Sequence, residues 1–304
     1  MARKGINPIL DSMKIFLAGV EGGEPQTIKH HIENAFYSYY YMRKKGDTKI
    51  IGAKDSHQLV FVDSGAHSFF NEKSEEGVMS ATIHIKKSKT KETPKEYFDN
   101  YVIWLKENWN HFDYYAELDI GVIVGQKKVL EWREVLKKEN LYSKCVPVYH
   151  PDIMSWEDYI DMLDTCESSY IALEGDRRNR KRLPYNKLIK PAYDRGIKVH
   201  GFAMTKHSVM GTYPFYSVDS TSWLAGDMFG YVPEFANGKI RMLDVNKKKD
   251  YLKSLGTLDI NLMLKPTTKK ERRISNMLCG VVAYSKAQTY YTKLWETRNI
   301  NWVG

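Results

Sequence analysis

Two aspartates that lie far apart in the sequence are the residues best suited to carry out chemistry. Asp63 follows the apolar run 59–62 and opens the turn Asp63-Ser64-Gly65, and Asp219 ends a second predicted strand, 216–219. Two carboxylates on opposite sides of a pocket can cleave a glycosidic bond, because one attacks the anomeric carbon and the other handles the leaving group's proton. Asp, Ser and Gly also dominate ordinary turns, so the motif at Asp63 alone leaves a purely structural turn open.

Short apolar runs alternate with amphipathic segments along the chain, and these elements must position the two aspartates. The runs predict strands over residues 14–20, 59–62, 114–120, 145–149, 170–173, 198–204, 216–219 and 239–243. Helices are predicted over 25–42, from Pro94 after a capping box at Thr93, and over 126–139, 155–163, 185–195 and 274–295. Roughly eight strand–helix units favour a (β/α)8 TIM barrel, an α/β fold, over an open doubly wound sheet.

Length and composition are consistent with one large domain. The chain has 304 residues, of which 42% are hydrophobic, so we expect a single domain over 1–304. The barrel is predicted to cover about 14–245, with a polar insertion near 71–91 and a C-terminal helical extension over about 246–304. No apolar run approaches the ~18 residues of a membrane span, and no signal-peptide core follows the basic N-terminus. Three widely spaced cysteines favour a reducing, cytoplasmic setting.

The balance of charge points to a polyanionic partner. The formal net charge is +9 at pH 7, and basic proteins of this kind often bind nucleic acid. A cluster of arginines would suit contacts with a phosphate backbone, although charge runs are also common in solvated loops; its members are Arg177, Arg178, Arg180 and Arg182. Neither a G-x-G-x-x-G nor a P-loop motif is present, which counts against dinucleotide binding and P-loop chemistry.

Several predicted strands place a polar or ionisable residue at or just after their C-terminal ends. In a barrel of parallel strands these ends meet at one mouth, where active sites are found. Polarity beside loops is also explained by solvation, so the shared position of the residues, rather than any one of them, supports a site. They are Asp63, Asp119, Tyr149 with His150, Glu174, Met204 with Thr205, and Asp219.

The first motif, Phe-Val-Asp-Ser-Gly-Ala-His-Ser over 61–68, resembles the Asp-Ser-Gly-Gly-aromatic-Gln signature of tRNA-guanine transglycosylases. Those enzymes are (β/α)8 barrels that exchange guanine for a 7-deazaguanine base. The stretch 217–223 stands where that family has its nucleophile strand, and 199–204 and 172–175 resemble two of its pocket strands. The similarity runs in motif order over roughly 14–230, and its first motif is the most specific.

The resemblance implies a role for each matching residue. Asp219 would be the nucleophile at C1′ of the sugar, Asp63 the general acid/base, and Asp119 the group that grips the N1/N2 edge of a purine. An ordinary core-packing role stays open for His67 and Met204. The other base-binding residues that the resemblance implies are Ser64, His67, Tyr149, Glu174, Gly175 and Met204.

The sequence also departs from the family pattern. Ala66 replaces a glycine, Ser68 replaces the glutamine, and the Cys-x-Cys-x-x-Cys zinc motif is absent because Cys279 stands alone. No metal or other cofactor is therefore expected. A compact, basic chain without this motif is more similar to the phage-type 7-deazaguanine DNA transglycosylases than to the tRNA enzymes.

The resulting hypothesis is a pentosyltransferase that exchanges guanine in DNA for a 7-deazaguanine such as preQ0, acting in the cytoplasm, or in the host cytoplasm if phage-encoded. Its partners would be DNA, or alternatively tRNA, and the free base, with no membrane involved and a homodimer left open. The alternatives are a tRNA-guanine transglycosylase, a barrel glycoside hydrolase acting on carbohydrate, and a catalytically silent paralogue.

Overall fold

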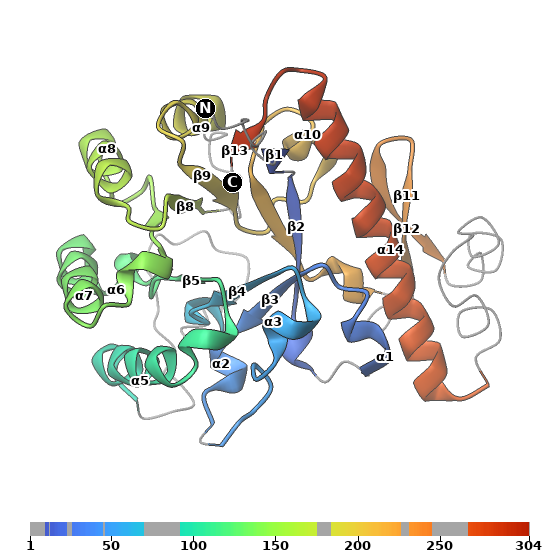
Figure 1. Cartoon of the computed structure of the whole chain (residues 1–304), viewed down its shortest axis with the longest axis horizontal. Coiled ribbons are helices and arrows are strands. Elements are labelled where there is room, and N and C mark those ends of the chain that lie inside the picture. Colours follow the sequence, from blue (N-terminus) through green and yellow to red (C-terminus); the bar gives the residue numbers. More distant parts are fainter. Residues whose placement is uncertain are drawn as a thin grey trace, which may run out of the picture.

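The computed structural model describes residues 10–11, 13–22, 26–44, 46–69, 92–174, 184–225, 231–244 and 267–303. Its centre is a sheet with the strand order β6-β5-β4-β3-β2-β10-β9-β8-β7. Every neighbouring pair in this sheet is parallel, and the sheet curls into a nearly closed barrel with helices around it (Figure 1). The predicted TIM barrel is therefore confirmed. The barrel strands are β2 (Lys14–Ala18), β3 (Asn34–Ser38), β4 (Leu59–Asp63), β5 (Tyr114–Ala116), β6 (Cys145–Val146), β7 (Val148–Tyr149), β8 (Tyr170–Leu173), β9 (Lys198–Gly201) and β10 (Ser217–Ser220).

The ring of strands closes through Pro147, which separates β6 from β7. β5 pairs with β6 and β7 pairs with β8, so the two short strands act as one interrupted strand. Proline has no N–H to donate, so the regular ladder is interrupted at Pro147. The next N–H, that of Val148, donates a 2.7 Å hydrogen bond to the side chain of Glu117, which also forms a buried ion pair with Arg133 at 2.7 Å. The carboxylate of Glu117 thus holds the seam of the barrel together.

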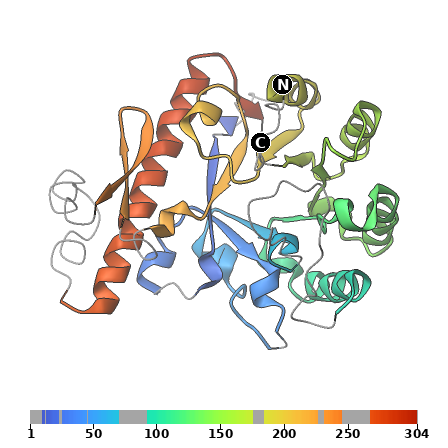
Figure 2. The same cartoon turned by 180° about the vertical axis from the view of Figure 1, so that it is seen from behind.

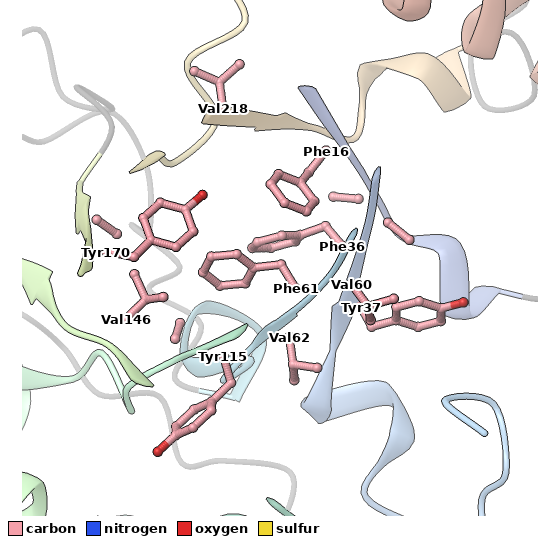
Figure 3. Packing of buried hydrophobic residues seen from close by; sticks show 14 of the residues in the cluster. Phe16, Phe36, Tyr37, Val60, Phe61, Val62, Tyr115, Val146, Tyr170 and Val218 are labelled. Carbon is pink, nitrogen blue, oxygen red and sulfur yellow. The ribbon is translucent and has the colours of Figure 1, made fainter. Parts of the chain in front are cut away.

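Alternate residues of each strand fill the barrel interior, as the two-residue period of a strand requires. Phe16, Phe36, Phe61 and Tyr170 point toward the centre, whereas Val218 points outward from β10 (Figure 3). The rings of Phe36 and Phe61 lie 5.0 Å apart, and that of Phe16 packs edge-on to Phe61 at 5.7 Å. The interior is therefore a packed aromatic core, and any functional site must lie above it.

Long helices cover most of the outside of the barrel. The capping boxes at Thr93 and Ser155 are formed as the sequence predicts, with each side chain accepting from the backbone three residues on. The longer helices are α5 (Pro94–Glu107), α7 (Gln126–Lys138), α8 (Trp156–Thr165), α9 (Tyr185–Asp194) and α14 (Lys269–Glu296). The shorter ones are η1 (Val20–Gly22), α1 (Gln26–Lys29), α2 (Tyr39–Met42), α3 (Ala53–Ser56), α4 (Ala66–Phe69), η2 (Trp109–His111), α6 (Gly121–Val124), η3 (Tyr142–Lys144), α10 (His207–Met210) and η4 (Ser222–Leu224).

Helix α14 runs along the side of the barrel at β2 (Figures 1 and 2). The side-chain oxygen of Gln288 accepts hydrogen bonds from the Ile15 N–H (2.7 Å) and from the Asn34 amide (2.9 Å), which ties the helix to β2 and β3. Gly280 lies so close to Trp223 that a Cβ there would fall 2.2 Å from the Trp223 carbonyl oxygen. Helix α14 therefore packs against the backbone of Trp223 through a close contact that only glycine allows.

Two small pairs of antiparallel strands complete the described fold. The first joins the two ends of the described chain, where β1 (Leu10–Asp11) pairs with β13 (Trp302–Val303). The second is a hairpin of β11 (Tyr231–Ala236) and β12 (Lys239–Asp244), which packs against α14. No helix among the described residues is both long and apolar enough to cross a membrane.

Some predicted elements differ from those observed. The helix predicted over 25–42 is wrong, because β3 occupies its middle with only the four-residue helices α1 and α2 on either side. The strand predicted over 239–243 belongs to the hairpin and not to the barrel. The strands predicted over 114–120 and 198–204 end earlier, at Ala116 and Gly201. The insertion predicted near 71–91 lies outside the described residues, as does part of the extension, 245–266.

Candidate active site

Five carboxylates gather around the end of the barrel where the parallel strands finish. Asp63 is the last residue of β4, and Asp219 lies on β10, one residue before that strand ends. Glu174 follows β8 directly, Asp119 follows β5 by three residues, and Glu21 lies in η1 beyond β2. The C-terminal ends of barrel strands face one mouth. The predicted convergence of Asp63, Asp119 and Asp219 is thus consistent with the topology, and the charges of the latter two act on Asp63.

Asp63 has the electrostatic surroundings expected of an acid/base catalyst. Burial, followed by the negative charge of Asp219, raises the pKa of Asp63 from its ordinary 3.8 to about 7, and Asp119 and Glu21 add to the effect. A hydrogen bond from the Gly65 N–H to Asp63 Oδ2 (3.1 Å) opposes it. A carboxyl group that titrates near neutrality can both give and take a proton at physiological pH.

The turn after Asp63 has a conformation that requires glycine. Gly65 has a φ of +73°, and a Cβ there would lie 2.4 Å from Tyr40 Cβ and 2.8 Å from the Tyr40 backbone nitrogen. Ser64 is fully buried, and its carbonyl accepts a 2.7 Å hydrogen bond from the Tyr97 hydroxyl. The turn is therefore fixed from both sides, which fixes the direction of the Asp63 carboxylate.

Asp219 is buried and is held through one of its two oxygens. Oδ1 accepts a 2.6 Å hydrogen bond from the Ala203 N–H, and His200 Nε2 lies 3.4 Å from the same oxygen. Ala203 has a left-handed φ of +54°, an unfavourable conformation for a residue with a Cβ. Strain of this kind persists only where the surrounding structure imposes it, and it often occurs at functional sites. Here it directs a backbone donor at the carboxylate.

His150 joins two more of the carboxylates. Its Nε2 contacts Asp119 Oδ1, and its Nδ1 lies 3.0 Å from Glu174 Oε2. Burial by itself would lower the pKa of His150, but the charges of Asp119 and Glu174 and their hydrogen bonds outweigh it and raise the pKa to about 10. The imidazole is therefore protonated at neutral pH and donates to both carboxylates, which fixes Asp119 and Glu174 at the mouth.

Two predicted pocket residues, Tyr149 and Met204, pack against other side chains of the fold. The ring of Tyr149 packs at 4.7 Å on Tyr159 of α8, a helix on the outside of the barrel, and its role in lining the pocket stays a prediction. Met204 is buried, and its sulfur would be 2.8 Å from a Cβ placed on Gly201. This position agrees with the core-packing role left open for Met204.

Several predicted residues cannot be placed. Of the predicted base-binding residues, His67 has a described backbone in α4, but its side chain lies outside the described part. Gly175 and the four arginines predicted to contact phosphates also lie outside the described residues; these are Arg177, Arg178, Arg180 and Arg182.

The sequence analysis assigned no specific role to three residues of this region. Glu21 is buried, its side chain accepts from the Ser38 N–H at 3.3 Å, and burial raises its pKa to about 7. The bridging role of His150 and the contact between His200 and Asp219 were likewise not predicted. A signal was present for His200, because it interrupts an otherwise apolar stretch, 199–204, within a predicted strand. In the described part of the chain, no group of three or more His, Cys, Asp or Glu side chains is arranged to hold a metal ion.

Comparison with known proteins adds little to this geometry. No protein-family model matches the sequence. No curated protein matches it either. A solved structure that does match is the carboxyl transferase domain from Rhizobium etli pyruvate carboxylase with 3-bromopyruvate, at 11% sequence identity and a TM-score of 0.40. The match covers 93% of this chain and 48% of the carboxyl transferase chain, so this chain spans about half the length of that solved structure. A likeness this distant says nothing about the reaction.

Proposed function

We propose that the protein is a base-exchange enzyme that replaces guanine in DNA with a 7-deazaguanine base. The observation that carries the proposal is the pair Asp63 and Asp219, which lie at the ends of β4 and β10 and interact strongly enough for Asp219 to raise the pKa of Asp63. Two coupled carboxyl groups, one of them titrating near neutrality, suit double displacement at a glycosidic carbon.

In this mechanism, Asp219 attacks C1′ of the sugar while the bond from C1′ to N9 of guanine breaks. The bonding electrons leave with guanine, and protonated Asp63 gives its proton to the departing base. The incoming 7-deazaguanine then returns a proton from its N9 to Asp63 as its N9 attacks C1′ and releases Asp219. Two displacements on opposite faces keep the configuration at C1′, and a pKa of about 7 allows Asp63 to take both roles.

The acidic mouth suits a base edge better than it suits phosphate. The side chains of Asp119 and Glu174 are both fixed by His150, and ionised carboxylates accept hydrogen bonds from N–H donors. The N1–H and exocyclic amine of guanine or a 7-deazaguanine form such an edge. The overall charge of +9 supports binding of the polymer backbone elsewhere on the protein. The reacting nucleotide would have to be flipped out of its stack to reach this mouth.

The proposal is tested by incubating the protein with labelled guanine or preQ0 and either duplex DNA or unmodified tRNA. We expect label to enter DNA with wild-type protein and to be lost with Asp219→Asn. Label in tRNA and none in DNA would replace the DNA assignment with the tRNA one. Label in neither polymer, together with sugar release from a simple glycoside, would favour a barrel hydrolase.

A further inference from the structure

A buried histidine on β9 lies directly beneath the proposed nucleophile. His200 is fully buried, and its ring stacks on Phe36 with a centroid distance of 5.7 Å and an interplanar angle of 9°. It also packs against Phe61 at 5.1 Å and Phe202 at 4.8 Å. Aromatic neighbours on several sides fix the orientation of the imidazole, so the directions of its two nitrogens are set by the fold.

The first ring nitrogen joins a chain of hydroxyl groups inside the barrel. His200 Nδ1 lies 2.6 Å from Ser217 Oγ, and Ser217 Oγ is hydrogen-bonded to the Tyr170 hydroxyl. These residues come from the adjacent strands β9, β10 and β8, and the ladder pairs Ser217 directly with His200. Figure 3 shows the ring of Tyr170 pointing into the barrel.

The second ring nitrogen faces Asp219. His200 Nε2 lies 3.4 Å from Asp219 Oδ1 and is a buried nitrogen with no well-formed hydrogen bond to any described residue. A neutral imidazole donates from one nitrogen and accepts at the other. Because a lone pair facing a carboxylate would be repulsive, the proton belongs on Nε2. Ser217 then donates to Nδ1 and accepts from the Tyr170 hydroxyl, and the Nε2 proton faces Asp219 Oδ1.

We propose that His200, supported by Ser217 and Tyr170, is a positioning residue that holds Asp219 Oδ1 and thereby presents Oδ2 as the attacking oxygen. The inference rests on the proposed function in that it takes Asp219 as the nucleophile. The Ala203 N–H donates to Asp219 Oδ1, and His200 Nε2 faces the same oxygen. No hydrogen bond from the described residues reaches Asp219 Oδ2. A catalytic contact that is long in the free enzyme commonly tightens when substrate binds.

The kinetic test uses His200→Phe, which keeps the ring and its stacking but removes both nitrogens. We expect kcat for base exchange to fall about 10- to 100-fold, the range that misplacing a reacting group by ~1 Å can reach. KM for the polymer should be unchanged, because His200 is buried below the mouth. His200→Gln keeps an N–H donor and should recover part of the rate. An unchanged kcat for His200→Phe would overturn the proposal.

Two serine variants separate positioning from folding. Ser217→Ala removes the hydroxyl that sets the His200 tautomer and should lower kcat, whereas Ser168→Ala is the matched control. Ser168 donates a hydrogen bond to the Cys145 carbonyl just before β8, at the opposite end of the barrel. Both variants lose one hydrogen-bonded hydroxyl, so a loss of kcat in Ser217→Ala but not in Ser168→Ala would support the proposal. Equal losses of kcat would refute it.

A spectroscopic test needs no activity. Nitrogen-15 NMR of the histidine rings should show His200, assigned by its disappearance in His200→Phe, as the tautomer protonated at Nε2. Asp219→Asn should shift the Nε2 signal. A proton on Nδ1, or no shift in Asp219→Asn, would overturn the His200 proposal even if base exchange were confirmed. Conversely, the expected spectrum without any exchange activity would leave the geometry intact and refute the proposed function.

Discussion

Removing the charge of Asp63 is expected to stabilise the protein, and to do so more at neutral pH than in acid. Asp63→Asn keeps an oxygen that can accept from the Gly65 N–H, so the local hydrogen bond is retained. What disappears is a carboxylate whose pKa burial and Asp219 raise from 3.8 to about 7. The folded state binds this proton more tightly than the unfolded chain, so wild-type stability falls as the pH rises between these two values.

The size of the effect follows from the proton affinity. At about 1.4 kcal/mol for each tenfold change, a pKa that moves from 3.8 to about 7 corresponds to about 4 kcal/mol. Asp63→Asn should therefore gain little over wild type near pH 4. The gain should grow up to about pH 7 and stay level above it, reaching at most about 4 kcal/mol.

The assay is urea unfolding followed by circular dichroism at a series of pH values from 4 to 8.5. Asp99→Asn on the exposed face of α5 is the matched control and should track wild type. A second variant, Asp219→Asn, removes the second-largest cause of the raised pKa of Asp63. Its free energy of unfolding should therefore depend less steeply on pH than that of wild type. Curves for Asp63→Asn and wild type that stay parallel across this range would refute the reasoning.

Three further variants test other parts of the account. His150→Gln should be less stable than wild type at neutral pH, because protonated His150, with its pKa raised to about 10, stabilises the fold. Wild-type stability should fall from about pH 6.5 to 10 as His150 loses its proton, whereas the variant should show no such fall. Equal pH profiles would contradict this. Gly65→Ala should lose stability and base exchange together, since its φ of +73° and its contact with Tyr40 exclude a Cβ; a fully stable and active variant would be inconsistent with the turn. Arg133→Met should cost about 3–5 kcal/mol in urea unfolding because Glu117 is left charged and buried, and adding Glu117→Gln should recover part of the loss; no recovery would argue against an electrostatic cause.

The barrel was predictable because its strands are apolar runs bounded by polar turns, and its helices carry clear start signals at Thr93 and Ser155. β3 was missed for a physical reason. Its sequence, Asn-Ala-Phe-Tyr-Ser, leads without a break into Tyr-Tyr-Tyr-Met of α2, so one aromatic run contains a strand and a helical turn. Only pairing with β2 and β4 selects the extended conformation over residues 34–38.

The candidate site was only partly predictable. Asp63 and Asp219 could be found because each lies at the end of a predicted strand, and this position tolerates small errors in the predicted strand boundaries. The predicted pocket position of Tyr149 depends on the exact strand register, because a shift of one residue along a strand exchanges inside for outside. His150 and His200 gain their roles from contacts with residues on neighbouring strands. A polar residue within an apolar stretch marks the position of His200, but the local sequence does not show which residues it contacts.

The most direct test of the central claim is to trap the enzyme on its polymer. Wild-type protein mixed with end-labelled DNA, without an incoming base, should give a denaturation-resistant adduct whose tryptic mass spectrum places the sugar on Asp219. Asp219→Asn should give none, and added preQ0 should discharge the wild-type adduct. An adduct attached to another residue, or exchange that proceeds in Asp219→Asn, would contradict the account.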